Sequence, residues 1–186
     1  SVYELSCFYV VFDVVSGYIV FSGANQAVMV AHLCRPRHSS SSTGVSFLTK
    51  LGSDIYGQDY FSYLRAEPGF HSSEGLLRCP DKDVSTGVAL ITVDQAGRNT
   101  IIIQPGANME LQPEEVTTFI TNQAQYANVL VCQNEISHRA TLQALAEVSR
   151  IDHMVSIFNP APISSNIENM FELLRYADVS LTFVPS

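Results

Sequence analysis

Three short segments place polar side chains where a predicted strand ends. Gly23-Ala24-Asn25-Gln26 opens a predicted helix, Gln133-Asn134-Glu135 follows a strand predicted over residues 128–132, and Asn159 follows a strand predicted over residues 154–158. In open parallel sheets, ligands bind beyond the carboxyl ends of the strands. Amide and carboxylate side chains there can hydrogen-bond neighbouring sugar hydroxyls, and a carboxylate makes the stronger bonds. The pattern therefore predicts a sugar-binding site.

Each of these segments also has a purely structural explanation. Asn25 could cap its helix. Glu135 could be a solvated loop carboxylate or a favourable charge near a helix start. Asn159 could be a turn residue before Pro160. From residue types and spacing alone, these alternatives stay open.

The other reactive side chains match no known catalytic or metal-binding pattern. His32, Cys34 and His38 lie close together, but their spacing fits no standard zinc arrangement and a fourth ligand is missing. The sequence contains no Walker P-loop, no G-x-S-x-G motif and no Ser-His-Asp pattern. We therefore predict no metal site and no catalytic residue among them.

The elements after residue 110 alternate between helix and strand. Pro113-Glu114-Glu115 marks one helix start, and Ser137 caps another. Residues 167–176 are predicted to be helical, and a further strand begins within residues 179–184. With the two strands named above, this order predicts an α/β fold with a doubly wound, mostly parallel sheet.

The first 104 residues contain a predicted hairpin and a surface insertion. Asp94 to Arg98 supply turn residues between strands at residues 86–93 and 100–104. The Ser-rich residues 35–44 read as a polar surface insertion. The other predicted elements are strands at residues 7–15, 18–21 and 45–48, and helices at residues 25–33 and 54–64.

Composition excludes several classes of function. The 186 residues are 46% hydrophobic and 15% charged, which suits one domain with a real core. The net charge is −8 without a basic stripe, which argues against binding nucleic acid or an anionic membrane. Asp13 interrupts the apolar residues 5–21, so we expect a buried strand there rather than a membrane span or signal peptide.

The cysteines predict a reducing compartment. Cys7, Cys34, Cys79 and Cys132 are scattered and form no C-x-x-C pair. A chain with a core of this size does not need disulfides, so we expect reduced thiols. The expected location is the cytoplasm, with the nucleus left open as a second one.

Six motifs follow one another along the chain over residues 17–178, interrupted by the insertion. They are residues 23–27 (GANQA), 52–57 (GSDIYG), 85–93 (STGVALITV), 97–108 (which end in Gly-Ala-Asn), 133–135 (QNE) and 159–162 (NPAP). In this order they resemble the ribokinase branch of the ribokinase (PfkB) sugar-kinase family, in which the first matches the end of Gly-Gly-Lys-Gly-Ala-Asn-Gln-Ala, the second a G-x-D-x-x-G element and the fifth a Q-x-E element.

The resemblance implies ATP-dependent phosphorylation of D-ribose at its 5-hydroxyl, with Mg²⁺ and a monovalent cation, K⁺, as cofactors. It implies a ribokinase-like three-layer α/β/α fold with a small β lid, and a homodimer contact through that lid. The residues that match the family's sugar contacts are Gly23, Asn25 and Glu135. Further candidates on the substrate side are Asp13, Ala89, Ile91, Ile103 and Asn159.

The sequence also departs from the family pattern. Phe21 and Ser22 stand before Gly23, where the family has Gly-Gly-Lys, and residues 181–186 differ from its P-N-E-x-E element. The family's Gly-Ala-Gly-Asp motif, which supplies the catalytic base, has no counterpart in these 186 residues. We therefore expect residues 1–186 to form one partial kinase domain, truncated before the ATP-binding half and inactive alone.

Other interpretations remain open at this point. Within the wider family the substrate could be another sugar or adenosine. The chain could instead be a non-catalytic sugar-binding or regulatory fragment. It could also be an incomplete or non-productive product of a ribokinase gene.

Overall fold

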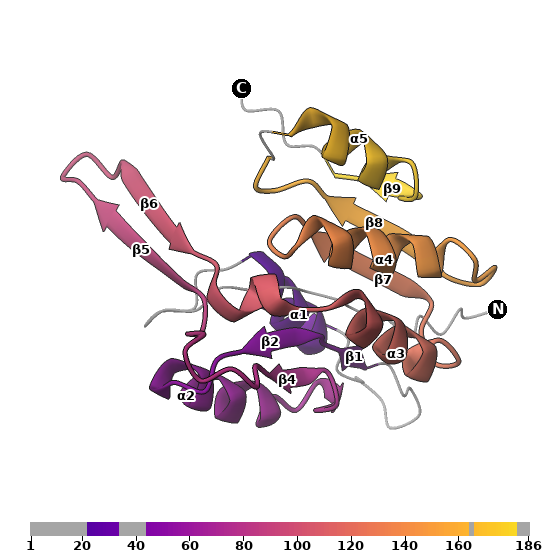
Figure 1. The fold of residues 1–186 in the computed structure, drawn as a ribbon, viewed down its shortest axis with the longest axis horizontal. Coiled ribbons are helices and arrows are strands. Elements are labelled where there is room, and N and C mark those ends of the chain that lie inside the picture. Colours follow the sequence, from indigo (N-terminus) through magenta and orange to yellow (C-terminus); the bar gives the residue numbers. More distant parts are fainter. Residues whose placement is uncertain (1–21, 34–43, 164–165, 182–186) are drawn as a thin grey trace.

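The computed structural model describes residues 22–33, 44–163 and 166–181 (Figure 1). The predicted strands at residues 7–15 and 18–21 and the candidate Asp13 lie outside these residues. So does the predicted insertion, apart from Gly44.

A three-stranded parallel sheet organises the second half of the chain. Its strands lie in the order β7-β8-β9, with Gln133 opposite Asn159 at the ends of β7 and β8. This confirms the predicted alternation of helix and strand. The elements are α3 (Pro113–Gln123), β7 (Val129–Gln133), α4 (His138–Val148), β8 (Val155–Asn159), α5 (Ile167–Leu174) and β9 (Val179–Ser180).

One apolar cluster joins this sheet to its helices. Leu130 and Cys132 of β7 and Phe158 of β8 are buried together with side chains of α3 and α4, such as Ile120 and Leu145. Alternate residues of a strand face the same side, so these three side chains form one face of the sheet. The helices start as predicted: α3 has Pro113 first, and the Ser137 hydroxyl accepts a hydrogen bond from Ala140 N at the start of α4.

The first half of the chain contains two parallel strand pairs, β1 with β3 and β2 with β4. A second apolar cluster joins these strands to the helices α1 and α2. It includes Ala27 of α1, Phe47, Leu51 of β2 and Leu64 of α2. The elements are α1 (Ser22–Leu33), β1 (Val45–Ser46), β2 (Thr49–Leu51), α2 (Ile55–Arg65), β3 (Phe70–Ser72) and β4 (Leu76–Arg78).

The predicted strand at residues 45–48 is wrong in detail. It is replaced by the separate strands β1 and β2, because Phe47 and Leu48 pack into different apolar clusters. The short strands β3 and β4 were not predicted, since three residues carry too little periodicity to stand out.

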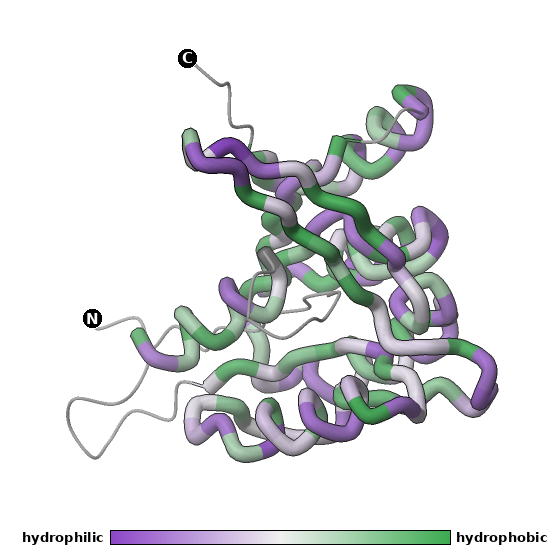
Figure 2. The backbone as a smooth tube through the Cα atoms, turned by 90° about the vertical axis from the view of Figure 1, so that its left-hand side faces the viewer, coloured by the Kyte–Doolittle hydropathy of each residue, from purple (hydrophilic) through white to green (hydrophobic). Residues whose placement is uncertain are grey.

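The predicted hairpin is present as β5 (Val88–Val93) and β6 (Asn99–Gln104), followed by a 3₁₀ helix, η1 (Gly106–Glu110). Asp94 closes its turn by accepting hydrogen bonds from the backbone N–H groups of Ala96 and Arg98. Figure 1 shows the hairpin projecting from the body. In Figure 2 its legs are largely hydrophobic and its turn is hydrophilic.

Two further predictions can be compared with the described residues. Cys79 and Cys132 are buried free thiols, and burial raises the pKa of Cys132; Cys7 and Cys34 lie outside these residues. None of the helices in the described ranges has the length and apolar character needed to cross a bilayer.

Candidate functional site

The first turn of α1 presents the segment that contains Asn25. Gly23 and Ala24 are buried, Gln26 is partly buried and Asn25 is exposed. The helix begins at Ser22, so the predicted start at Asn25 was three residues late. Asn25 lies inside the helix, which rules out the alternative that it is the helix cap.

A hydrogen bond joins this turn to the end of β7. Gln133 Nε2 donates to Gln26 Oε1 across 2.6 Å, and the Gln133 side chain is fully buried. Asn25 precedes Gln26, and Glu135 follows two residues after Gln133. Two residues of extended chain span at most about 7 Å. The segments that carry Asn25 and Glu135 therefore meet at one end of the sheet.

The loops after β7 and β8 are bonded to each other. We call them the strand-exit edge, residues 133–135 and 159–162. Asn134 N donates to Ala161 O at 3.0 Å, and Asn134 Nδ2 donates to Pro162 O at 2.8 Å. The edge is thus held as one unit.

Glu135 and Asn159 occupy different surroundings on the strand-exit edge. Glu135 is partly buried and lies two residues before Ser137, the N-cap of α4. The positive end of that helix favours a carboxylate nearby, so this structural explanation remains alongside a binding role. Asn159 is buried as the last residue of β8. It therefore belongs to the strand rather than to a turn.

The hairpin carries the three apolar candidates. Ala89 lies opposite Ile103, and Ile91 lies opposite Ile101, so all four share one face. Ala89 is buried, Ile91 is partly buried and Ile103 is exposed. In Figure 1, β8 points toward the side of the molecule from which the hairpin projects.

The base of the hairpin is held by Asp54, which also caps α2. Its Oδ1 accepts from Gly57 N at 2.8 Å and from the Thr86 hydroxyl at 2.6 Å, and its Oδ2 accepts from Thr86 N at 2.7 Å. The Thr86 hydroxyl in turn accepts from Gly52 N at 3.0 Å. The G-x-D-x-x-G element therefore positions the hairpin, a role that the sequence reasoning missed.

These contacts also change the acidity of Asp54. Burial would raise the pKa of its carboxyl group. Hydrogen bonds from the side chain of Thr86 and from the backbone N–H groups of Gly57 and Thr86, with the positive charge of Arg78, outweigh burial and hold the pKa below its ordinary value.

A largely apolar hollow of about 460 Å³ lies between α1 and the sheet. It is lined by Asn25, Gln26, Met29, Val30, Val131, Ile157 and Leu181. The polar residues Asn25 and Gln26 belong to the first turn of α1, so the hollow borders the Gln26–Gln133 bond.

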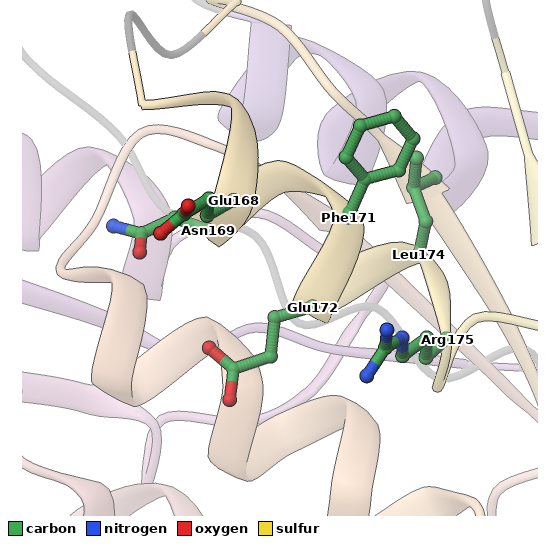
Figure 3. A pocket seen from close by; sticks show the side chains of 6 residues that line it. All are labelled: Glu168, Asn169, Phe171, Glu172, Leu174 and Arg175. Carbon is green, nitrogen blue, oxygen red and sulfur yellow. The ribbon is translucent and has the colours of Figure 1, made fainter.

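A second hollow, of about 640 Å³, runs along α5 (Figure 3). All of its lining residues belong to that helix or to the residue after it: Glu168, Asn169, Phe171, Glu172, Leu174 and Arg175. None of the predicted sugar contacts is among them. This hollow is an open helix face rather than the site that the motifs predict.

Across the ranges that the structure describes, no three or more His, Cys, Asp or Glu side chains gather in a way that could hold a metal ion.

Comparisons with known proteins agree with this architecture. The sequence model of the pfkB family carbohydrate kinases matches residues 22–182. The chain is 33% identical to mouse (Mus musculus) ribokinase over 152 residues, which cover 82% of this chain and 43% of that protein. The chain therefore spans less than half the length of this curated relative.

Solved structures show the same fold. Ribokinase from Thermotoga maritima matches with a TM-score of 0.64 and 28% identity, over 95% of this chain and 59% of that one. Arabidopsis thaliana ribokinase, solved in complex with ribose and ATP, matches with a TM-score of 0.67 and 22% identity, over 95% and 59%.

The predicted ribokinase-like α/β fold is thus confirmed. The match to the family covers most of the chain, including the turn of α1, the hairpin and the strand-exit edge. The chain belongs to the pfkB family of carbohydrate kinases.

Proposed function

We propose that this chain supplies the sugar-binding portion of a kinase that transfers the γ-phosphoryl group of ATP to the 5-hydroxyl of D-ribose. The observation that carries the proposal is the Gln26–Gln133 hydrogen bond, which brings the segments of Asn25 and Glu135 to one end of the sheet. The relatives named as ribokinases, one of them solved with ribose and ATP, support ribose and ATP as the reactants.

Each proposed contact has a chemical role. The Glu135 carboxylate accepts hydrogen bonds from two neighbouring hydroxyls, and the Asn25 amide both donates and accepts. Gly23 has no side chain, which permits close approach of a ligand to the backbone. The apolar face of the hairpin, formed by Ala89, Ile91 and Ile103, would cover the carbon framework of the sugar and exclude water.

Sugar binding by these residues is tested by calorimetric titration of the chain with D-ribose, with D-fructose and adenosine as comparison ligands. We expect ribose to bind with the highest affinity, because residues 85–93 (STGVALITV) and 106–108 (Gly-Ala-Asn) resemble the ribokinase branch of the family. Stronger binding of adenosine would assign the site to a nucleoside, and the absence of binding to all three would refute the proposed sugar site.

Phosphoryl transfer also needs ATP, Mg²⁺ and, from the family resemblance, K⁺. The family's Gly-Ala-Gly-Asp motif, which supplies the catalytic base, has no counterpart in these 186 residues, so no catalytic step is assigned to their side chains. We propose that these 186 residues alone give no ribose-dependent release of ADP. A coupled ADP-release assay tests this, and clear ribose-dependent turnover would overturn it.

We further propose that a second copy of the chain packs on the outer face of the hairpin. Leu90 and Ile102 lie opposite each other on that face and are 64% and 66% exposed. Apolar surface of this kind is commonly covered by a partner. The cytoplasmic location remains a prediction from the sequence.

A further inference from the structure

The loop after β8 has almost no backbone donors of its own. In Pro160-Ala161-Pro162 only Ala161 has a backbone N–H group, because proline lacks one. Each proline also fixes its own φ at about −65° and keeps the residue before it extended, so Asn159 and Ala161 are restricted as well. The loop is therefore locally stiff, and a neighbouring segment can hold it mainly through its carbonyl groups.

One residue donates to two adjacent carbonyl groups of this loop. Asn134 N donates to Ala161 O at 3.0 Å, and the side-chain Nδ2 of Asn134 donates to Pro162 O at 2.8 Å. The first bond is made by the backbone and needs no particular residue type, whereas the second requires a side-chain donor at position 134. Because the loop is stiff, two bonds to neighbouring carbonyls restrain both its position and its direction.

Asn134 lies between a fixed residue and Glu135. Gln133, which precedes it, is the last residue of β7 and is paired with Asn159 in the β7–β8 ladder. Glu135 comes directly after Asn134, and the next residue, Ile136, is buried in the apolar core. The backbone of Glu135 therefore runs between two fixed points, and the bonds made by Asn134 set one of them.

We propose that Asn134 is a positioning residue for the sugar site: its two bonds hold the loop at residues 159–162 and the segment of Glu135 at a fixed separation before the sugar binds. Asn134 is not among the proposed sugar contacts, so its effect on binding is indirect. This inference rests on the proposed function, because the separation matters only if Glu135 binds the sugar. Groups that are already ordered bind more tightly, since less free energy is lost in ordering them when the ligand arrives.

The substitution Asn134→Leu removes the side-chain bond and keeps both the size of the side chain and the backbone bond. We expect the Tm of the chain to change little, because Pro162 is exposed and its carbonyl can accept a hydrogen bond from water instead. We expect the Kd for D-ribose, measured by calorimetry, to rise about fivefold, since the loop must then be ordered on binding. Asn134→Gln keeps an amide donor and should restore most of the affinity.

Gln58→Leu is the matched control, because the exposed Gln58 amide also donates to a backbone carbonyl, Ser53 O, at 3.3 Å. It should change neither the Tm nor the affinity for ribose. Wild-type affinity in Asn134→Leu, or an equal loss in Gln58→Leu, would overturn the positioning role. An equal loss in Asn134→Gln and Asn134→Leu would overturn it as well, because the amide donor would then be irrelevant.

A second measurement needs no sugar. The NMR order parameter of the Ala161 backbone N–H should be about 0.85 in the wild-type chain and in Gln58→Leu, and should fall toward about 0.6 in Asn134→Leu. An unchanged value in Asn134→Leu would show that the side chain does not hold the loop, and would overturn the inference whether or not ribose binds. A lowered value in a chain that binds no ribose would support the held loop and count against the proposed sugar site alone.

Discussion

Gln26 and Gln133 lie 107 positions apart in the sequence, and their side-chain amides are joined by a hydrogen bond of 2.6 Å. The bond ties the first turn of α1 to the last residue of β7. Neither glutamine was among the predicted sugar contacts, yet each is within two residues of one of them. We therefore expect this pair to fix the distance between Asn25 and Glu135.

Gln133→Leu should weaken ribose binding more than it weakens the fold. The substitution removes the bond to Gln26, worth about 1 kcal/mol. It also removes the Gln133 Oε1 acceptor, which is buried without a partner among the described residues, and this offsets part of the loss. We expect an about fivefold higher Kd for ribose, measured by calorimetry, with a nearly unchanged Tm.

A double-mutant cycle with Gln26→Leu isolates the bond, and we expect a coupling of about 1 kcal/mol in the binding free energy. Gln143→Leu is the control, because this α4 side chain bonds Thr117 and Glu147 away from the strand-exit edge. Additive effects of the two leucine substitutions would show that the bond does not position the site.

Asp54→Asn should destabilise the fold although Asp54 lies outside the sugar contacts. The carboxylate caps α2 and holds Thr86, and an amide cannot accept at both of its terminal atoms. We expect the free energy of unfolding, measured in urea, to fall by about 2 kcal/mol. The exposed Asp59→Asn on the same helix should change it little. Equal effects of the two substitutions would contradict the positioning role.

The contribution of Asp54 should depend on pH. Its pKa is lowered in the folded chain, so the unfolded chain binds the proton more readily as the pH falls. Its stabilising effect is therefore complete above the ordinary aspartate pKa of about 4 and is lost as the pH falls through the lower, folded value. The difference between wild type and Asp54→Asn should shrink over that window. A difference that stays constant down to the lowest accessible pH would show that the charge is not involved.

Charges on the outer face of the hairpin should prevent self-association. Leu90→Glu with Ile102→Glu places carboxylates directly opposite each other on the exposed face. We expect sedimentation velocity to show a dimer for the wild-type chain and a monomer for this variant. Gln95→Glu in the turn adds charge away from that face and should leave the dimer intact. A monomeric wild-type chain would exclude the proposed interface.

The elements that were predicted correctly have strong local signals. Asp54, Pro113 and Ser137 mark helix starts by their types alone, and residues 94–98 mark the turn of the hairpin. The parallel sheet followed from alternation of the elements, without knowledge of any contact. Capping and turn chemistry act within a few residues, so they can be read from a single sequence.

The features that were missed depend on contacts across the chain. β3 and β4 exist because they pair with β1 and β2, and their own residues carry little strand signal. The Gln26–Gln133 bond and the Asp54–Thr86 contact each require distant segments to meet. For the Gln26–Gln133 bond, the sequence did carry a signal. Gln133 is a polar residue at the end of an apolar strand, and a polar side chain that becomes buried there needs a hydrogen-bond partner.

The proposed sugar site is tested by titrating D-ribose into the wild-type chain and into Asn25→Leu and Glu135→Gln variants. We expect ribose to bind the wild-type chain and to lose at least about tenfold in affinity in each variant, because hydrogen bonds to sugar hydroxyls are removed while Tm is little changed. Wild-type affinity in both variants would contradict the assignment of the site.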